Sequence, residues 1–111
     1  MIANIGLPSR LWDPVQRREA KNIWGDILDI QYPEIPAEAS EQAVGAIADD
    51  LVDSVKNAGD ITAVVVKGEL SLMIAVVDRL RSSGYDVYAA SSERTVLKKR
   101  TRHSFVRFRK L

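Results

Sequence analysis

Three short segments of the chain combine small, hydroxyl and cationic residues, which are the residue types that hold a phosphate group. One surrounds Ser9 and Arg10, the second covers residues 67–71, and the third covers residues 91–94. Glycine lets the backbone approach a ligand closely, hydroxyl groups donate hydrogen bonds, and cations balance negative charge. The candidate ligand-binding residues are Ser9, Arg10, Lys67, Gly68, Glu69, Ser71, Ser91, Ser92 and Arg94.

Each of these segments also has a purely structural interpretation. Ser71 could cap a helix, Gly68 could permit a turn, and Glu69 could favour the positive end of a helix. An ion pair between Glu93 and Arg94 is the structural alternative for the third segment. Neither a GxGxxG nor a Walker sequence is present, so dinucleotide binding and nucleoside triphosphate hydrolysis have no support.

The chain has few groups for metal or nucleophilic chemistry. It has no cysteine, which excludes disulfides, thiolate metal sites and cysteine nucleophiles. His103 is the sole histidine and has no second ligand residue near it in the sequence, so we expect no metal site and no cofactor. General-base action by His103 has no support from its neighbours, and no catalytic residue is identified. For Trp12 and Trp24 we expect packing rather than stacking on a base.

Composition predicts a single folded domain with an uneven charge. The chain has 111 residues, of which 46% are hydrophobic, enough for a buried core. Residues 85–111 carry eight Lys/Arg and two Asp/Glu (+6), so residues 1–84 carry eight and thirteen (−5). No apolar run reaches the roughly 20 residues of a membrane span, and the first residues do not resemble a signal peptide. We expect a cytoplasmic protein without membrane contact.

The elements that must position these residues follow an α/β order. Residues 61–66 are almost all β-branched, as in a strand covered on both faces, and residues 26–30 alternate like a strand near a sheet edge. Alternating strands and helices predict a parallel sheet between two helical layers. Predicted strands cover residues 1–5, 26–30, 61–66 and 85–90; predicted helices run from 14 to about 24, from 37 or 40 to 59, and from about 70 to 84.

The basic C-terminal segment predicts one more strand. Residues 103–109 alternate in a strand-like manner, and we expect them at the sheet edge, antiparallel to their neighbour, with 95–102 as a basic loop or partial hairpin. The expected fold is therefore one Rossmann-like domain over residues 1–111. It is a three-layer α/β sandwich with a mostly parallel sheet and an antiparallel C-terminal edge strand. Ligands of such sheets bind at the carboxyl ends of the strands, where the three candidate segments should meet.

The second half of the chain resembles a known family. The runs YAASSERTV (Tyr88–Val96) and FVRFRKL (Phe105–Leu111) are similar to the C-terminal signature of small stand-alone CRISPR-associated proteins with a Rossmann-like fold of the CARF type. The run KGELSLMIAVV (Lys67–Val77) is similar to their central Gly-acid turn and helix. The chain departs from the pattern at Ser91 and Ser92, where threonine is commoner, and at Leu111, where an aromatic residue is usual.

The resemblance implies a function in nucleotide signalling. It implies binding of a cyclic oligoadenylate, the second messenger of type III CRISPR defence, in a pocket across a homodimer. Some relatives cut the ring without a metal, as ring nucleases, by aligning a ribose 2′-hydroxyl with the scissile phosphate. By this resemblance Ser91, Ser92 and Arg94 form a hydroxyl-hydroxyl-Glu-Arg turn, and Gly68 with Glu69 forms the central turn. Ser9, Arg10 and Lys67 are added because of their expected place at the rim.

The sequence leaves other function classes open. Residues 94–110 could bind a nucleic-acid backbone through salt-sensitive contacts, or the chain could be an adaptor without a ligand. Alternatively, the run of basic residues at 98–102 is only a solvated loop, and we favour this interpretation over nucleic-acid binding. Phe105 and Phe108 would serve as a stacking platform only if both faced solvent, and strand alternation turns at least one of them inward.

Overall fold

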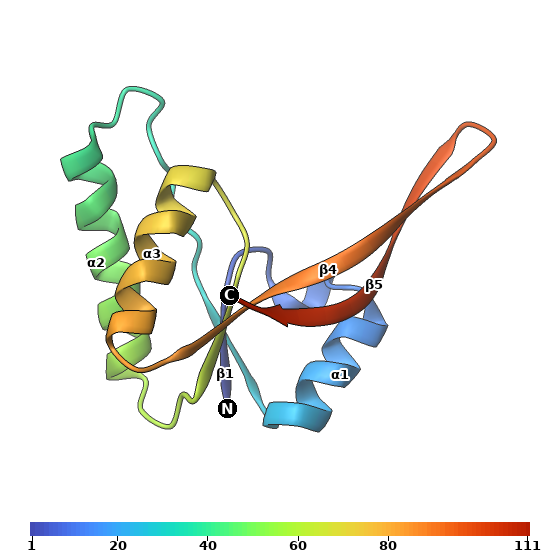
Figure 1. The fold of residues 1–111 in the computed structure, drawn as a ribbon, viewed down its shortest axis with the longest axis horizontal. Coiled ribbons are helices and arrows are strands. Elements are labelled where there is room, and N and C mark those ends of the chain that lie inside the picture. The colour runs from blue at the N-terminus through green and yellow to red at the C-terminus, as the bar shows by residue number, and fades with distance from the viewer.

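The sheet has five strands in the order β2-β1-β3-β4-β5 (Figure 1). The structure is a computed structural model that describes residues 1–111. Strands β1 to β4 run parallel to their neighbours, and β5 is antiparallel to β4. The predicted Rossmann-like α/β sandwich with an antiparallel C-terminal edge strand is therefore confirmed. The strands are β1 (Ile2–Ile5), β2 (Ile27–Ile30), β3 (Ala63–Val66), β4 (Asp86–Leu97) and β5 (Arg100–Lys110).

Helices cover both faces of the sheet. Helix α1 (Pro14–Trp24) lies on one face, whereas α2 (Glu41–Asn57) and α3 (Leu70–Ser82) lie side by side on the other (Figure 1). The larger buried cluster includes residues of α2 and α3, and a smaller one lies around Trp12 and Phe108. All four residues of β3 are buried, as expected for a β-branched strand at the sheet centre.

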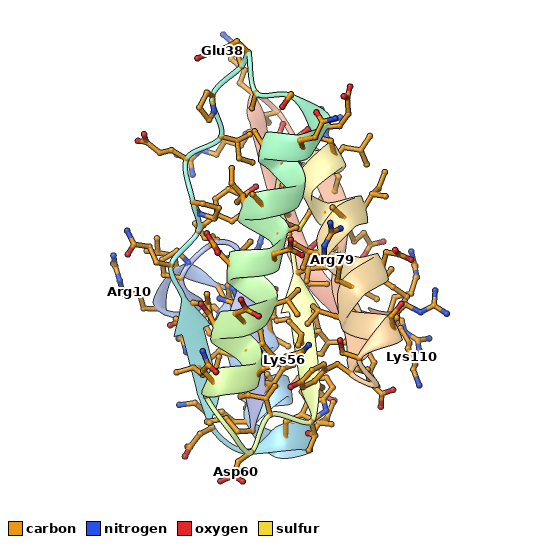
Figure 2. All side chains as sticks on the ribbon, turned by 90° about the vertical axis from the view of Figure 1, so that its left-hand side faces the viewer. Arg10, Glu38, Lys56, Asp60, Arg79 and Lys110 are labelled. Atoms are coloured by element: carbon orange, nitrogen blue, oxygen red, sulfur yellow. The ribbon has the colours of Figure 1, made fainter.

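Side chains at the start of each helix accept hydrogen bonds from free backbone N–H groups. Asp13 accepts from Val15, with Pro14 at the first helical position, as the sequence predicts. Ser40 accepts from Ala43 at the start of α2. Figure 2 looks onto α2 and α3, where Arg79 pairs with Asp49 at 2.7 Å and joins the two helices.

The C-terminal hairpin is longer than predicted. Strand β4 continues through residues 91–97, and β5 begins at Arg100 instead of residue 103. Only Lys98 and Lys99 separate the strands, and Lys98 has a left-handed φ of 54°. The predicted serine turn is wrong, and of the two alternatives for residues 95–102 the hairpin is correct and the loop is wrong, because the two strands satisfy each other's backbone groups. The pair projects from the body as a twisted ribbon (Figure 1).

Aromatic packing fixes the base of this ribbon. The centroid of the Phe108 ring lies 5.1 Å from that of Trp24 and 6.4 Å from that of Trp12, and the ring centroids of Phe105 and Phe108 are 4.9 Å apart. The predicted packing role of both tryptophans is confirmed. No helix in the structure combines the length and the apolar character that crossing a membrane requires.

Candidate functional site

The loop after β1 is held by a hydrogen-bonded carboxylate. Asp29 of β2 accepts from the Ser9 N–H at 3.0 Å, from the Ser9 hydroxyl at 2.8 Å and from the Asn4 amide at 2.8 Å. Partial burial favours a higher pKa for Asp29, but the hydrogen bonds from Asn4 and Ser9 outweigh it and lower the pKa. Both donors of Ser9 are therefore engaged in positioning the loop.

Arg10 lies apart from the other candidate cations. It lines an open hollow of about 620 Å³ together with Arg17 and Lys21, and Lys67 is not among the residues of that hollow. Arg17 donates to the Ser9 carbonyl at 3.0 Å, which fixes the short helical turn at Ser9–Leu11. Figure 2 shows Arg10 and Lys110 projecting on opposite sides of the molecule.

The loop after β3 lies against Tyr32, which comes from the extended segment that follows β2. The Glu69 N–H donates to the Tyr32 hydroxyl at 2.7 Å, and the Tyr32 ring covers Gly68. A Cβ on Gly68 would lie 2.6 Å from the Tyr32 Cζ atom, which is well inside van der Waals contact. Glycine is therefore required here because the ring approaches the backbone, whether or not a ligand does.

Glu69 caps helix α3. Its carboxylate accepts from the Ser71 N–H at 3.0 Å, from the Leu72 N–H at 2.9 Å and from the Ser71 hydroxyl. The hydroxyl of Ser71, followed by the two N–H groups, lowers the pKa of Glu69. The structural interpretation of Glu69 and Ser71 is thus the correct one. A phosphate cannot use this helix end as its site while the carboxylate occupies it.

Residues 91–94 form part of strand β4 instead of a loop. Ser91 pairs with Arg107 and Ser92 pairs with Phe105, with a bulge between the two pairs. Successive residues of a strand point to opposite faces, so the two serines face different sides of the sheet. Ser91 accepts a hydrogen bond from Arg109 at 3.4 Å, whereas Ser92 lines the hollow that also contains Lys67.

This hollow is the place where candidate residues meet. It has a volume of about 150 Å³ and lies between the carboxyl end of β3, the start of α1 and the ribbon. Lys67, Ser92, Gln16 and His103 make no side-chain hydrogen bond, so their polar groups are free to bind a ligand. Its polar lining comprises Asn4, Asp13, Gln16, Lys67, Ser92 and His103.

Asp13 supplies a fixed negative charge at the edge of the hollow. Its carboxylate accepts from the Phe105 N–H at 2.9 Å as well as from Val15, so it joins α1 to β5. The bond from Phe105, followed by that from Val15, lowers the pKa of Asp13. The carboxylate is engaged by backbone donors, and Asp13 forms no ion pair with Lys67.

Lys67 lies at the junction of three hollows. Its backbone N–H donates to the Ile5 carbonyl at 2.9 Å, which extends the pairing of β1 with β3. Besides the 150 Å³ hollow, Lys67 lines two open hollows of about 520 and 590 Å³, and Gly68 lines both of these as well. Lys67 is therefore the one cation that lines all three of these hollows.

A comparison with protein families supplies an assignment for the chain. One family model matches residues 5–109. The chain belongs to the family described as the uncharacterized protein MJ1673 family. The match begins at the end of β1 and reaches β5, so it includes the rim and the ribbon. No curated protein and no solved structure matches the chain.

In this member of the MJ1673 family, the structure brings together Lys67 and Ser92 but not Arg10, and it gives Ser9, Glu69 and Ser71 structural partners. Sequence reasoning missed Gln16 and set His103 aside. His103 lies directly opposite Arg94 in the ribbon, so both share the face that carries Ser92. The alternation of His103 with Phe105, whose ring faces the α1 side, was the signal that could have placed it there.

Proposed function

We propose that this chain binds a cyclic oligoadenylate at the rim hollow around Lys67, as a CRISPR-associated domain of the CARF type. The observation that carries the proposal is the meeting of Lys67 and Ser92 in one hollow, with neither side chain engaged by the protein. An unpaired ammonium and a free hydroxyl are the groups that bind a phosphodiester. The sequence resemblance supports this choice of ligand, and the two free polar groups of the hollow support this location for it.

The charges around the hollow favour an anion. The carboxylate of Asp13 stays ionised and accepts hydrogen bonds from two backbone donors, whereas Lys67 has no carboxylate partner. Arg94 shares the ribbon face with Ser92 and His103 and forms no ion pair. A phosphate at the hollow would therefore meet cations from the loop after β3 and from β4. The adenine bases would need apolar surface, which Leu7, Leu11 and Trp12 provide along the same hollow.

The size of the hollow favours a site completed by a second copy. Pockets that enclose a small ligand measure about 300–1,000 Å³, and a volume of about 150 Å³ holds no more than part of one nucleotide. A cyclic oligonucleotide would therefore lie across the rim and extend into the open hollows beside Lys67. Because such a ring has rotational symmetry, two copies related by a two-fold axis would enclose it with equivalent residues. The functional unit that we propose is a homodimer.

Cleavage of the ring is the second part of the proposal. A ribose 2′-oxygen would attack the adjacent phosphorus, the bond to the 5′-oxygen would break, and a 2′,3′-cyclic phosphate would form. The hydroxyl proton leaves to a base, and the departing 5′-oxygen takes up a proton. Histidine is the side chain most often used for such transfers, so His103 is the residue of the hollow we assign to it. Lys67 would stabilise the charge on the phosphorane oxygens.

Calorimetry with synthetic cyclic tetra- and hexa-adenylate tests the binding proposal. We expect binding of one ring per two chains, and a loss of at least tenfold in affinity for Lys67→Ala. Lys56→Ala is the matched control, because Lys56 is an exposed lysine of α2 without an ion pair. At a ligand concentration 100 times the Kd, binding adds about 2.7 kcal/mol to the stability of the native state. If neither ring binds at micromolar concentration, the proposal is wrong.

A further inference from the structure

The ribbon formed by β4 and β5 carries positive charge that the protein does not use. Residues 94–110 contain eight Lys/Arg and no Asp/Glu. Of these cations only Lys110 forms an ion pair, with Asp86 at 3.0 Å. All residues from Ser92 to His103 are exposed, and this part of the ribbon projects from the body (Figure 1). Seven cations of the ribbon thus form no ion pair, although Arg102 is near enough to Asp13 to help lower the pKa of that carboxyl, and Glu93 is an acidic residue of the same ribbon.

The pairing of β4 with β5 places four arginines on one face of this ribbon. Residues directly opposite each other in an antiparallel pair share a face. Arg100 pairs with Leu97, Arg102 with Thr95, Arg107 with Ser91, and Arg109 with Ala89. These partners and Glu93, which pairs with Ser104, are alternate residues of β4, so all of them lie on the face of the ribbon opposite to Ser92 and Arg94. We call the row of Arg100, Arg102, Arg107 and Arg109 the arginine face.

The arginine face contains no aromatic side chain for a base to stack on. Phe105 and Phe108 both belong to the cluster around Trp12 and Trp24, and Phe108 is only 7% exposed. Binding of single-stranded nucleic acid depends on such stacking, whereas contacts to phosphates of a duplex do not. The arginine face therefore offers cationic side chains that can contact phosphates and no aromatic ring on which an unpaired base could stack.

We propose that the β4–β5 ribbon is an arm that binds the backbone of double-stranded DNA without sequence preference. A two-stranded ribbon fits the major groove of B-form DNA, which is about 12 Å wide, whereas the major groove of A-form RNA is deep and narrow. The groove is bordered by phosphates on both sides. The distal ribbon matches this arrangement, with Arg100 and Arg102 on one face, Arg94 on the other and Lys98 with Lys99 at the tip.

The arginine face is distinct from the rim hollow, whereas Arg94 lies on the face that Ser92 and His103 share and enters both proposals. Ser92 and His103 face the hollow, and the arginine face lies on the other side of the same ribbon. Binding of DNA thus does not require the nucleotide ligand, and the two proposals can fail separately.

Fluorescence anisotropy with a labelled 20-base-pair DNA duplex, measured from 50 to 200 mM salt, tests the arm. Each phosphate neutralised in B-form DNA contributes about −0.9 to the slope of log K against log salt. The five distal cations (Arg94, Lys98, Lys99, Arg100 and Arg102) predict a slope of about −4.5, which is a loss of about 500-fold over this range.

Three double variants test the charge of the ribbon. One removes two positive charges from the ribbon, one keeps them, and one removes two positive charges from the helices. Arg100→Gln with Arg102→Gln should make the slope about 2 units shallower, so that the loss over the range falls to about 40-fold. Arg100→Lys with Arg102→Lys keeps the charge and should keep the slope. Arg18→Gln with Lys56→Gln changes exposed residues of α1 and α2 and should leave binding unaltered. Circular dichroism verifies that each variant is folded.

Several results would contradict the proposal that the ribbon binds double-stranded DNA. They are no binding at 50 mM salt, an unchanged slope in the Arg100→Gln and Arg102→Gln variant, or tighter binding of duplex RNA or single-stranded RNA of the same length. Loss of DNA binding in Lys67→Ala with no loss in the ribbon variants would assign the DNA to the rim instead.

Discussion

The contact between Tyr32 and Gly68 makes a strong prediction about stability. In Gly68→Ala the new Cβ would lie 2.6 Å from the Tyr32 Cζ atom, about 1 Å closer than the usual 3.5–4.0 Å between carbon atoms. Either the Tyr32 ring or the loop after β3 must move by that amount. Overpacking of this kind costs about 1–3 kcal/mol. Loss of the hydrogen bond between the Glu69 N–H and the Tyr32 hydroxyl adds about 1 kcal/mol.

The expected destabilisation of Gly68→Ala is therefore about 2–4 kcal/mol. At about 4 °C per kcal/mol for a domain of this size, Tm should fall by about 8–16 °C. Gly45→Ala is the matched control, because its Cβ would meet only the end of the Arg79 side chain, at 3.3 Å. Gly45 lies inside α2, where alanine is the better helix former, so this variant should be neutral or more stable by up to about 1 kcal/mol.

A double-mutant cycle isolates the contact. Chemical denaturation gives the free energies of unfolding of Gly68→Ala, Tyr32→Ala and the double variant. If the ring causes the cost, Gly68→Ala should be nearly neutral in the Tyr32→Ala background, so the coupling energy should equal the whole cost, about 2–4 kcal/mol. An equal cost of Gly68→Ala in both backgrounds would refute the reasoning, since the glycine would then be required for another reason.

Three further predictions concern the two strand faces, acid stability and catalysis. Ser92→Ala should weaken binding of cyclic tetra-adenylate by about tenfold or more in calorimetry, because one hydrogen bond to a charged group is lost. Ser91→Ala should leave the affinity unchanged, because Ser91 faces the other side of the sheet. Equal effects of the two substitutions would contradict this placement of the serines. Because the pKa of Asp29 is lowered in the fold, its contribution to stability is present above its ordinary value of 3.8 and lost as pH falls through the lowered value. Urea unfolding between about pH 5 and pH 2 should thus show a smaller acid loss for Asp29→Asn than for the unaltered chain, and identical curves would count against the Asn4–Asp29–Ser9 network. If the ring is cut, His103→Ala should abolish the product in mass spectrometry while calorimetry still detects binding; unchanged cleavage would remove His103 from the reaction.

Local sequence signals predicted most of the fold. The Asp13-Pro14 pair, the β-branched run before Lys67 and the apolar stripes of α2 and α3 each reflect a contact within one element or one layer. Such signals depend on periodicity and capping, which a single sequence displays. The length of the ribbon could not be obtained in this way. The basic and β-branched ends of β4 and β5, over residues 94–97 and 100–102, are stable as strands only because each satisfies the backbone groups of the other, and pairing is a property of two segments.

The candidate site was predicted less well than the fold, for the same reason. Lys67 could be placed because it follows a recognisable central strand. Ser9 was assigned to a ligand although Asp29, twenty residues away, engages its hydroxyl and its N–H. Glu69 was carried over from a family turn, whereas it accepts from Ser71 and Leu72 of its own helix. His103 entered the hollow only through the register of β5 with β4, which depends on the bulge beside Ser92.

The most direct test of the central claim is amide NMR of the ¹⁵N-labelled chain during titration with cyclic tetra-adenylate. The account predicts saturable shifts at Lys67, Gly68 and Ser92, with the Arg10 hollow unaffected. Shifts confined to Arg10 and Arg17, shifts confined to the arginine face, or no shifts at all would contradict it.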